Sequence, residues 1–150
     1  MLLIKNKTAH REFEIQQTYT AGIVLTGPEV KSLRQKHGSF AGSFVKMING
    51  EAWLLNAQIN PYAFADNRNY DSKRSRKLLL SKKEIAHLTQ MDQQKRISIV
   101  PLSFESMGKT IKLVIGVGRG KKEFEKRADL KARAVQRDVE RELKSRKINY

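Results

Sequence analysis

Two short apolar runs separated by Asn49-Gly50 constrain the fold of this chain more than any other feature of its sequence. The runs cover residues 44–48 and 52–59. An Asn-Gly pair between such runs is the strongest short-range signal of a β-hairpin, because both central residues of the turn need a positive φ. The sequence therefore predicts two antiparallel strands here and a mainly β fold around them.

Four further segments have the pattern of strands. Apolar and polar residues alternate over residues 13–16 and 97–102, and residues 21–26 form a compact apolar run. Ile111, Leu113, Ile115 and Val117 also alternate with their neighbours. This makes six short strands, and Pro101, which cannot donate to a ladder, predicts an edge or a bulge.

Two helices interrupt these strands. Pro28 stands at an expected first helical position, and the apolar spacing continues until Gly38. A capping box, Ser81 to Glu84, begins the second helix. Six strands with helices in these positions predict a mainly β domain over residues 1–118, a six-stranded closed barrel of the oligonucleotide-binding type with flanking helices.

The charge of the chain predicts a polyanionic partner. The 30 Lys and Arg residues against 15 Asp and Glu residues give a net charge of +15, and 18 of the basic residues fall within residues 1–118. Like charges repel in the free protein and become favourable when phosphates replace condensed counterions. Residues 68–83 are the densest basic segment, and they follow or include Tyr62, Phe64 and Tyr70, which could stack on unpaired bases. The simpler interpretation of this segment is a solvated loop and the first turn of a helix.

Residues 119–150 form a basic tail. Ala128, Ala132, Val135, Val139 and Leu143 would share one helix face, with arginines opposite. So thin an apolar stripe predicts a tail that is disordered or loosely helical when free and helical against RNA. The glycines over residues 116–120 favour a flexible hinge before this tail.

Several classes of protein are disfavoured. The chain has no cysteine, no apolar run near the roughly 20 residues of a membrane span, and no metal-ligand spacing among its three histidines. No convergent acid, base or nucleophile set can be named. We therefore expect a cytoplasmic protein, monomeric when free, that is not an enzyme and needs no metal or cofactor.

Several motifs together resemble the SsrA-binding protein family. They are Asn6-Lys7-Thr8-Ala9, Gly27-Pro28-Glu29-Val30-Lys31-Ser32-Leu33-Arg34, Arg74-Ser75-Arg76-Lys77-Leu78-Leu79-Leu80 and Gly120-Lys121-Lys122, and the likeness runs in order from residue 6 to residue 133. The resemblance implies an RNA-binding adaptor that binds transfer-messenger RNA and delivers it to stalled ribosomes for trans-translation.

The resemblance also implies two sets of site residues. The set for the tRNA-like domain of the RNA is Asn6, Lys7, Thr20, Lys31, Arg34, Arg74, Arg76 and Lys77. The set for the small-subunit decoding centre and messenger channel is Gly120, Lys121, Lys122, Phe124, Glu125, Lys126, Arg127, Arg133 and Arg137. The chain departs from the family pattern at Thr20, where a glutamate is usual, and at Glu125, where an aspartate is usual.

Two other classes stay open from the residues alone. A structural ribosomal protein would be equally small and basic, and would co-purify in equal amounts with translating ribosomes. A nuclease or RNA-modifying enzyme would need a catalytic set that the sequence does not offer.

Overall fold

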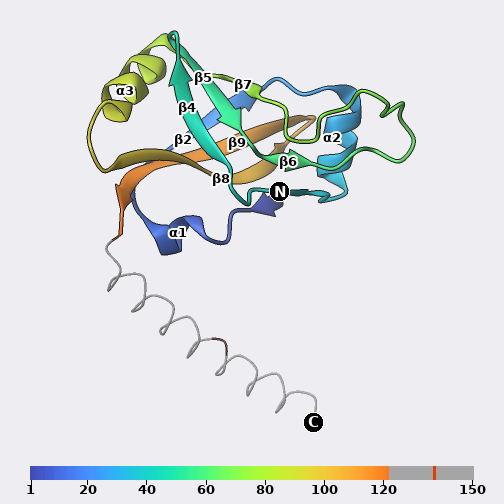
Figure 1. Ribbon diagram of the computed structural model, residues 1–150, viewed down its shortest axis with the longest axis horizontal. Helices are drawn as coiled ribbons and strands as arrows, with labels where there is room; N and C mark the ends of the chain where they lie inside the picture. Colours follow the sequence, from blue (N-terminus) through green and yellow to red (C-terminus); the bar gives the residue numbers. More distant parts are fainter. Residues whose placement is uncertain (122–136, 138–150) are drawn as a thin grey trace.

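The structure of the protein, a computed structural model, describes residues 1–121 and residue 137. Its elements follow one another in an order that mixes short and long strands with three helices (Figure 1). They are β1 (Leu2–Lys5), α1 (Ala9–Glu12), β2 (Phe13–Ile23), α2 (Gly27–Arg34), β3 (Gly38–Ser39), β4 (Phe44–Ile48), β5 (Glu51–Leu55), β6 (Gln58–Ile59), β7 (Arg76–Leu79), α3 (Lys82–Asp92), β8 (Ile97–Met107) and β9 (Thr110–Gly120).

The predicted hairpin is confirmed. β4 pairs with β5 antiparallel, with Ile48 opposite Glu51 across the turn. Asn49 and Gly50 both adopt the positive φ that this turn needs, 51° and 76°. The bulge predicted at Pro101 is confirmed too, because the register between β8 and β9 shifts between Pro101 and Ser103.

The mainly β class is confirmed, but the closed barrel is wrong. Seven antiparallel strands form one sheet in the order β1-β8-β9-β2-β7-β5-β4, and β3 pairs with β6 in a second, two-stranded sheet. The edge strands β1 and β4 are not hydrogen-bonded to each other, so the sheet stays open. β4 packs near β8 without joining it in a ladder, and β8 is already paired with β1 and β9.

The strand count also differs from six, for identifiable reasons. The two segments expected at residues 13–16 and 21–26 are one eleven-residue strand, β2. The segment expected at residues 52–59 is two strands, β5 and β6. β1, β3 and β7 were not predicted, because β1 and β3 have only four and two residues and β7 lies inside the basic segment.

The glycine-rich end of the body is a strand rather than a hinge. β9 continues to Gly120, which pairs with Phe13 of β2. A Cβ on Gly118 would lie 2.1 Å from the carbonyl oxygen of Glu14, so glycine permits the close approach of β2 here. The last strand therefore runs past residue 118, the predicted boundary of the body, and the division into body and tail stays a prediction.

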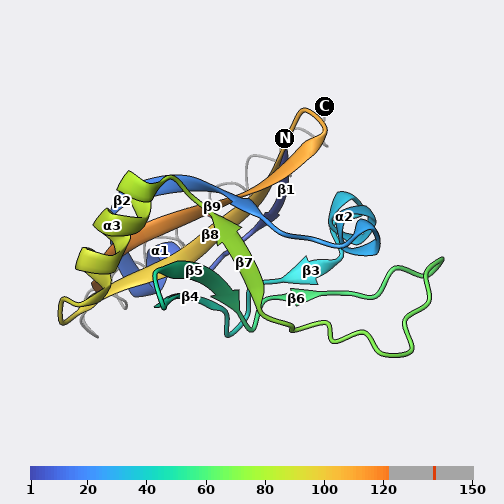
Figure 2. The same cartoon turned by 90° about the horizontal axis from the view of Figure 1, so that it is seen from above.

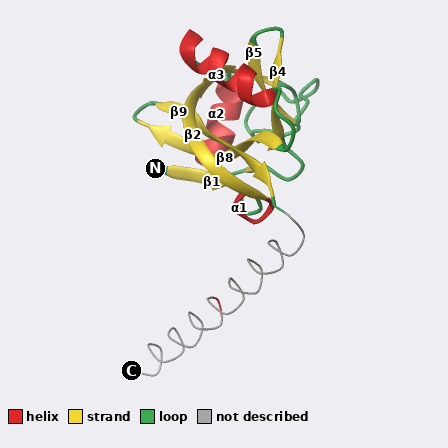
Figure 3. Ribbon diagram, turned by 90° about the vertical axis from the view of Figure 1, so that its left-hand side faces the viewer, coloured by secondary structure: helices red, strands yellow, loops and turns green. Residues whose placement is uncertain are grey.

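The two longer helices lie at opposite ends of the sheet (Figures 1 and 2). Seen from the α3 end, the strands curve about the centre of the molecule (Figure 3). Both helices begin with the capping box that their sequences encode, Thr26 with Glu29 in α2 and Ser81 with Glu84 in α3. Leu88 of α3 is fully buried in the core.

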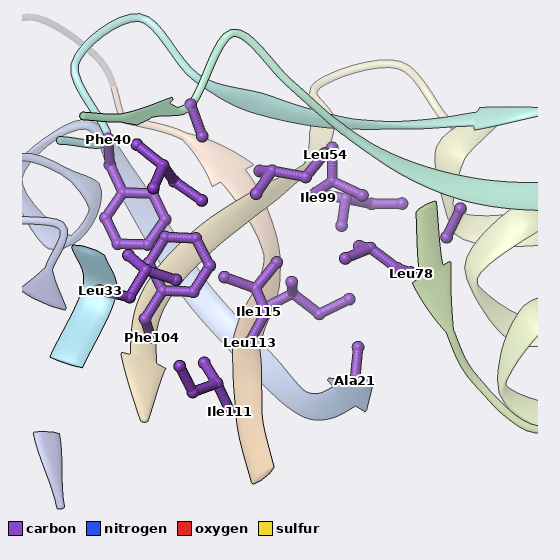
Figure 4. Close-up of a cluster of buried hydrophobic side chains, with 14 of the residues drawn as sticks. Ala21, Leu33, Phe40, Leu54, Leu78, Ile99, Phe104, Ile111, Leu113 and Ile115 are labelled. Carbon is purple, nitrogen blue, oxygen red and sulfur yellow. The ribbon is translucent and has the colours of Figure 1, made fainter. Parts of the chain in front are cut away.

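The core joins α2 to the sheet. Phe40 and Phe104 stack with their ring centroids 4.8 Å apart, and Leu33 of α2 lies beside them (Figure 4). Leu33 is fully buried, so the opposite face of α2 is turned outwards at this end of the molecule. The long segment between β6 and β7 projects at the same end (Figure 2). We call residues 60–75 the β6–β7 loop.

Candidate nucleic-acid interface

A buried carboxylate organises the end of the molecule where α2 and the β6–β7 loop meet. The side chain of Glu29 is 1% exposed, although it lies in the first turn of α2, three residues after the capping residue Thr26. Arg76 donates from Nε and Nη2 to Oε2 of Glu29 at 2.8 and 2.6 Å, and Arg74 donates from Nε to the same oxygen at 3.1 Å. Arg74 also forms an ion pair through Nη2 with Oε1 of Glu29. One carboxylate thus binds two arginines of the basic segment.

The carboxylate is ionised despite its burial. Burial alone would raise the pKa of Glu29, but hydrogen bonds from Arg74, from the backbone N–H of Thr26 and from Arg76 lower that pKa to about 2. The single proton of the Tyr70 hydroxyl is shared between Glu29 at 3.1 Å and the Ile59 carbonyl at 2.8 Å. Burial and the neighbouring negative charge of Glu29 raise the pKa of Tyr70 to about 12, so this hydroxyl stays a donor.

The surface position predicted for Arg76 is wrong. Its side chain is fully buried, and its guanidinium donates in every direction to protein oxygens. Besides Glu29, the acceptors are the carbonyls of Ala57, Arg74 and Ser72 and the hydroxyl of Tyr70. Arg76 therefore has no outward donor for a phosphate, and it acts within the fold by positioning the end of the β6–β7 loop.

The basic segment of residues 68–83 does not form one patch. Arg74 and Arg76 turn towards Glu29, whereas Arg68 is paired with Asp66 at 2.9 Å on the exposed side of the loop. Lys82 and Lys83 are exposed at the beginning of α3, at the other end of the sheet. The densest basic segment of the sequence is therefore divided among the β6–β7 loop, the strand β7 and the first turn of α3.

Lys31 and Arg34 are exposed on α2, as predicted. The ammonium of Lys31 lies 5.5 Å from the centre of the Tyr62 ring, within the range of a cation–π contact. Arg34 donates through Nη1 to the Ser106 hydroxyl at 3.3 Å and through Nη2 to the Lys109 carbonyl at 3.0 Å. These bonds tie the end of α2 to the β8–β9 hairpin and leave the outer side of the helix basic.

Thr20 and Lys77 share the outer face of the sheet. Gly22 of β2 is opposite Leu79 of β7, and residues two apart along a strand point to the same face. Thr20 is exposed, whereas Lys77 is half-buried and pairs with Glu51 at 3.5 Å. Leu79 is 53% exposed beside them, and the sequence prediction missed it. The sequence feature that could have indicated its exposure is the run Leu78-Leu79-Leu80, because alternation along a strand turns the middle residue outwards.

Asn6 and Lys7 occupy the turn between β1 and α1. The amide of Asn6 donates to the Pro101 carbonyl at 2.7 Å, and its oxygen accepts from the backbone and the hydroxyl of Thr8 at 3.3 and 3.1 Å. A hollow of about 480 Å³ adjoins this turn. Three lysines are among its lining residues: Lys5, Lys7 and Lys36. Asn6 thus shapes a turn that presents positive charge.

Of the predicted tail residues, the structure describes three. Gly120 belongs to β9, and Lys121 is held by the body through its N–H to the Glu12 carbonyl at 2.9 Å and its Nζ to the His10 carbonyl at 2.7 Å. Arg137 is exposed. The others, Lys122, Phe124, Glu125, Lys126, Arg127 and Arg133, lie outside the described residues.

The described part of the chain offers neither a metal site nor a membrane-spanning helix. Among residues 1–121 and 137, no three His, Asp or Glu side chains are grouped so that they could hold a metal ion. Within the same residues, no helix is long and apolar enough to cross a membrane. Among the described residues of the predicted RNA-binding set, exposed positive charge lies on α2 and at the β1–α1 turn, whereas the outer face of β2 and β7 presents Thr20 and the paired Lys77.

Comparison with known proteins adds a direct likeness. The family model described as "SmpB protein" matches residues 3–145. The SsrA-binding protein of Aquifex aeolicus is 46% identical over 145 residues, which cover 96% of this chain and 92% of that protein. The SsrA-binding protein of Lactiplantibacillus plantarum is 42% identical over 142 residues, covering 95% and 91%. A chain from a solved structure described as "tmRNA-SmpB: a journey to the center of the bacterial ribosome" superposes with a TM-score of 0.69 at 40% identity, covering 82% of this chain and 87% of that one.

Proposed function

The chain belongs to the SmpB protein family, and we propose on this basis that it binds transfer-messenger RNA and works with it on the ribosome in trans-translation. The observation that carries this proposal is the likeness to the chain of the tmRNA-SmpB ribosome structure, which is 40% identical and covers 82% of this chain. The protein is an RNA-binding adaptor, its partners are transfer-messenger RNA and the ribosome, and its place of action is the cytoplasm, where ribosomes translate. The resemblance that its sequence motifs indicated is confirmed.

Within this function, the body binds the tRNA-like domain of the RNA. Exposed basic groups on α2 and at the β1–α1 turn, Lys31, Arg34 and Lys7, contact phosphates. The outer face of β2 and β7 adds Thr20 and Leu79, which suit close packing against a ribose or a base. Arg74 and Arg76 act indirectly, because their bonds to Glu29 hold the β6–β7 loop in place.

The tail contacts the ribosome. Lys121 fixes the point at which it leaves the body, next to α1. From there Lys122, Phe124, Glu125, Lys126, Arg127, Arg133 and Arg137 reach the decoding centre and the empty messenger channel. The arginines complement the phosphates of ribosomal RNA, and an amphipathic stripe lets the segment become helical when it binds.

No chemistry is assigned to the protein. The described carboxylates and histidines do not converge on a site where a reacting atom could sit, and the buried carboxylate, Glu29, is bound by two arginines and a tyrosine. The peptidyl transfer that follows delivery is a reaction of the ribosome.

The test is the identity and salt dependence of the bound RNA. The full chain is captured from bacterial cells and its RNA is sequenced, and we expect transfer-messenger RNA to be enriched over ribosomal RNA. A structural ribosomal protein would instead bring down ribosomal RNA in equal amounts. Affinity for the purified RNA should fall steeply between about 50 and 200 mM salt, and an unchanged affinity would contradict phosphate contacts.

A further inference from the structure

The most exposed large apolar side chain of the described residues belongs to the β6–β7 loop. Phe64 is 85% exposed, more than any other such side chain of this part of the protein. A single exposed apolar residue is common and by itself indicates nothing. The surroundings of Phe64 make it informative, because its ring is supported from below and its backbone is fixed.

The ring of Phe64 rests on that of Tyr62. Their centroids are 5.4 Å apart and their planes are inclined by 66°, an edge-to-face arrangement. Tyr62 is half-buried, and the ammonium of Lys31 lies 5.5 Å from the centre of its ring. Lys31, Tyr62 and Phe64 form a contiguous group, the aromatic step, that runs from the outer side of α2 to solvent.

The backbone beneath the step is closed by hydrogen bonds. The N–H of Ala65 donates to the Tyr62 carbonyl at 3.1 Å. The amide of Asn67 donates to the same carbonyl at 2.8 Å and to the Ala65 carbonyl at 3.1 Å. Phe64 therefore lies at the apex of a fixed turn, and little conformational entropy remains to be lost when a partner packs on its ring.

The base of the loop is fixed as well. The Ser32 hydroxyl of α2 donates to the Asn60 carbonyl at 2.7 Å, and the N–H of Ile59 donates to the Ser72 carbonyl at 3.0 Å. Together with the arginines on Glu29, these bonds hold both ends of the loop against α2. The third aromatic residue of the loop, Tyr70, is excluded from the surface role because its hydroxyl is bound to Glu29 and Ile59.

The charge around the step selects the kind of partner. Lys31 is itself part of the step, Arg34 lies one turn further along the same helix, and Lys73 is exposed on the loop, where Arg68 offsets the charge of Asp66. An exposed aromatic ring with a lysine in the same contiguous group suits a nucleobase, a flat ring that is joined to a phosphate. We propose that Phe64 stacks on one unpaired nucleobase of transfer-messenger RNA while Lys31 and Arg34 contact the adjoining phosphates. This inference rests on the proposed function and adds a base contact to its phosphate contacts.

The test compares variants of Phe64 in the full-length protein with purified transfer-messenger RNA. Phe64→Ala should weaken binding by roughly five- to a hundred-fold, the effect of losing one stacked base. Phe64→Trp should retain affinity, because the indole presents a larger π-face. Phe64→Leu should lose most of it, because leucine keeps an apolar surface but cannot stack. The matched control is Phe44→Ala, since Phe44 is also exposed, at 41%, but lies on the edge strand β4.

Chemical probing of the RNA locates the contact. One unpaired base should be protected by the wild-type protein and reactive with Phe64→Ala. Equal binding of Phe64→Ala and wild type, or full affinity of Phe64→Leu, would overturn the stacking contact; the second result would indicate an apolar protein partner. Loss of binding only to ribosomes would overturn the choice of transfer-messenger RNA. If the wild-type protein itself does not bind this RNA, the proposed function fails, and the two failures are thus distinguishable.

Discussion

The carboxylate of Glu29 and the guanidinium of Arg76 form an ion pair of 2.6 Å in which neither side chain is more than 1% exposed. Glu29 comes from α2 and Arg76 from β7, 47 residues later in the chain. Two charges withdrawn from water are stable only when each is fully hydrogen-bonded, and here both are. The pair therefore joins the helix that carries Lys31 and Arg34 to the strand that carries Lys77 and Leu79.

Removal of the negative charge should destabilise the fold strongly. Glu29→Gln leaves the buried Arg76 without a counter-ion, and breaking such a pair costs about 3–5 kcal/mol of the free energy of unfolding. Glu51→Gln is the matched control, because Glu51 pairs with Lys77 at 3.5 Å with both side chains more than 40% exposed. That change should cost less than about 1 kcal/mol. Denaturant unfolding of the two variants measures the difference, and equal losses would contradict a structural role for the buried pair.

Lowering the pH should remove the contribution of Glu29 to the free energy of unfolding. The pKa of this carboxyl is lowered to about 2 in the folded protein, below its value of about 4.3 in an unfolded chain. Its stabilisation is therefore complete above about pH 5 and is lost as the pH falls towards 2, by roughly 3 kcal/mol in all. The free energy of unfolding, measured from pH 6 to pH 2, should fall less steeply in Glu29→Gln than in wild type. Parallel pH profiles would mean that Glu29 does not titrate with a lowered pKa.

Structural features that depend on contacts between neighbours in sequence could be predicted, and features that depend on distant contacts could not. The Asn49-Gly50 turn and the capping box at Ser81 depend on neighbours in sequence, and both were predicted from residue type and spacing. The open sheet could not be predicted from the sequence. Closure would require β4 to pair with a free edge of β8. The four residues of β1 occupy part of that edge, and a run of four carries too weak a period to predict.

In the candidate site, too, local features could be predicted and long-range contacts could not. A guanidinium is mostly exposed in proteins, so the sequence placed Arg76 on the surface with its basic neighbours. Its burial depends on Glu29, and no local spacing connects residues so far apart. The exposure of Lys31 and Arg34 was predictable, because Val30 and Leu33 set the inner face of one short helix.

Lys31 and Arg34 should be needed for RNA affinity but not for the fold. The double change to alanine removes two phosphate contacts, so the slope of log affinity against log salt should fall by about two. Stability should change little, because Arg34 loses only exposed hydrogen bonds to Ser106 and Lys109. The charge-matched control changes Lys82 and Lys83 to alanine at the opposite end of the sheet. Titration of transfer-messenger RNA at several salt concentrations measures the affinity and the salt slope of both double variants. Equal effects would show that net charge, rather than this face of α2, governs binding.

Truncation after Lys121 should separate RNA binding from action on the ribosome. β9 ends at Gly120, and Lys121 still bonds to the His10 and Glu12 carbonyls, so the shortened protein keeps every described contact of the body. We expect it to bind transfer-messenger RNA within a few-fold of the full chain. It should fail to support peptidyl transfer to the charged RNA on ribosomes stalled without a codon in the A site.

Charge reversal tests the reason for that failure. Changing Arg133 and Arg137 to glutamate should reproduce the truncation on the ribosome, because like charge would then meet the phosphate-lined messenger channel. Ala132→Gly should cause a milder loss, of about 1 kcal/mol, because glycine disfavours the helix that we propose for the bound tail. Both full-length variants should bind the free RNA as wild type does. A tailless protein that supports full transfer would refute this role of the tail, and the contacts of the body with RNA would stand independently of that result.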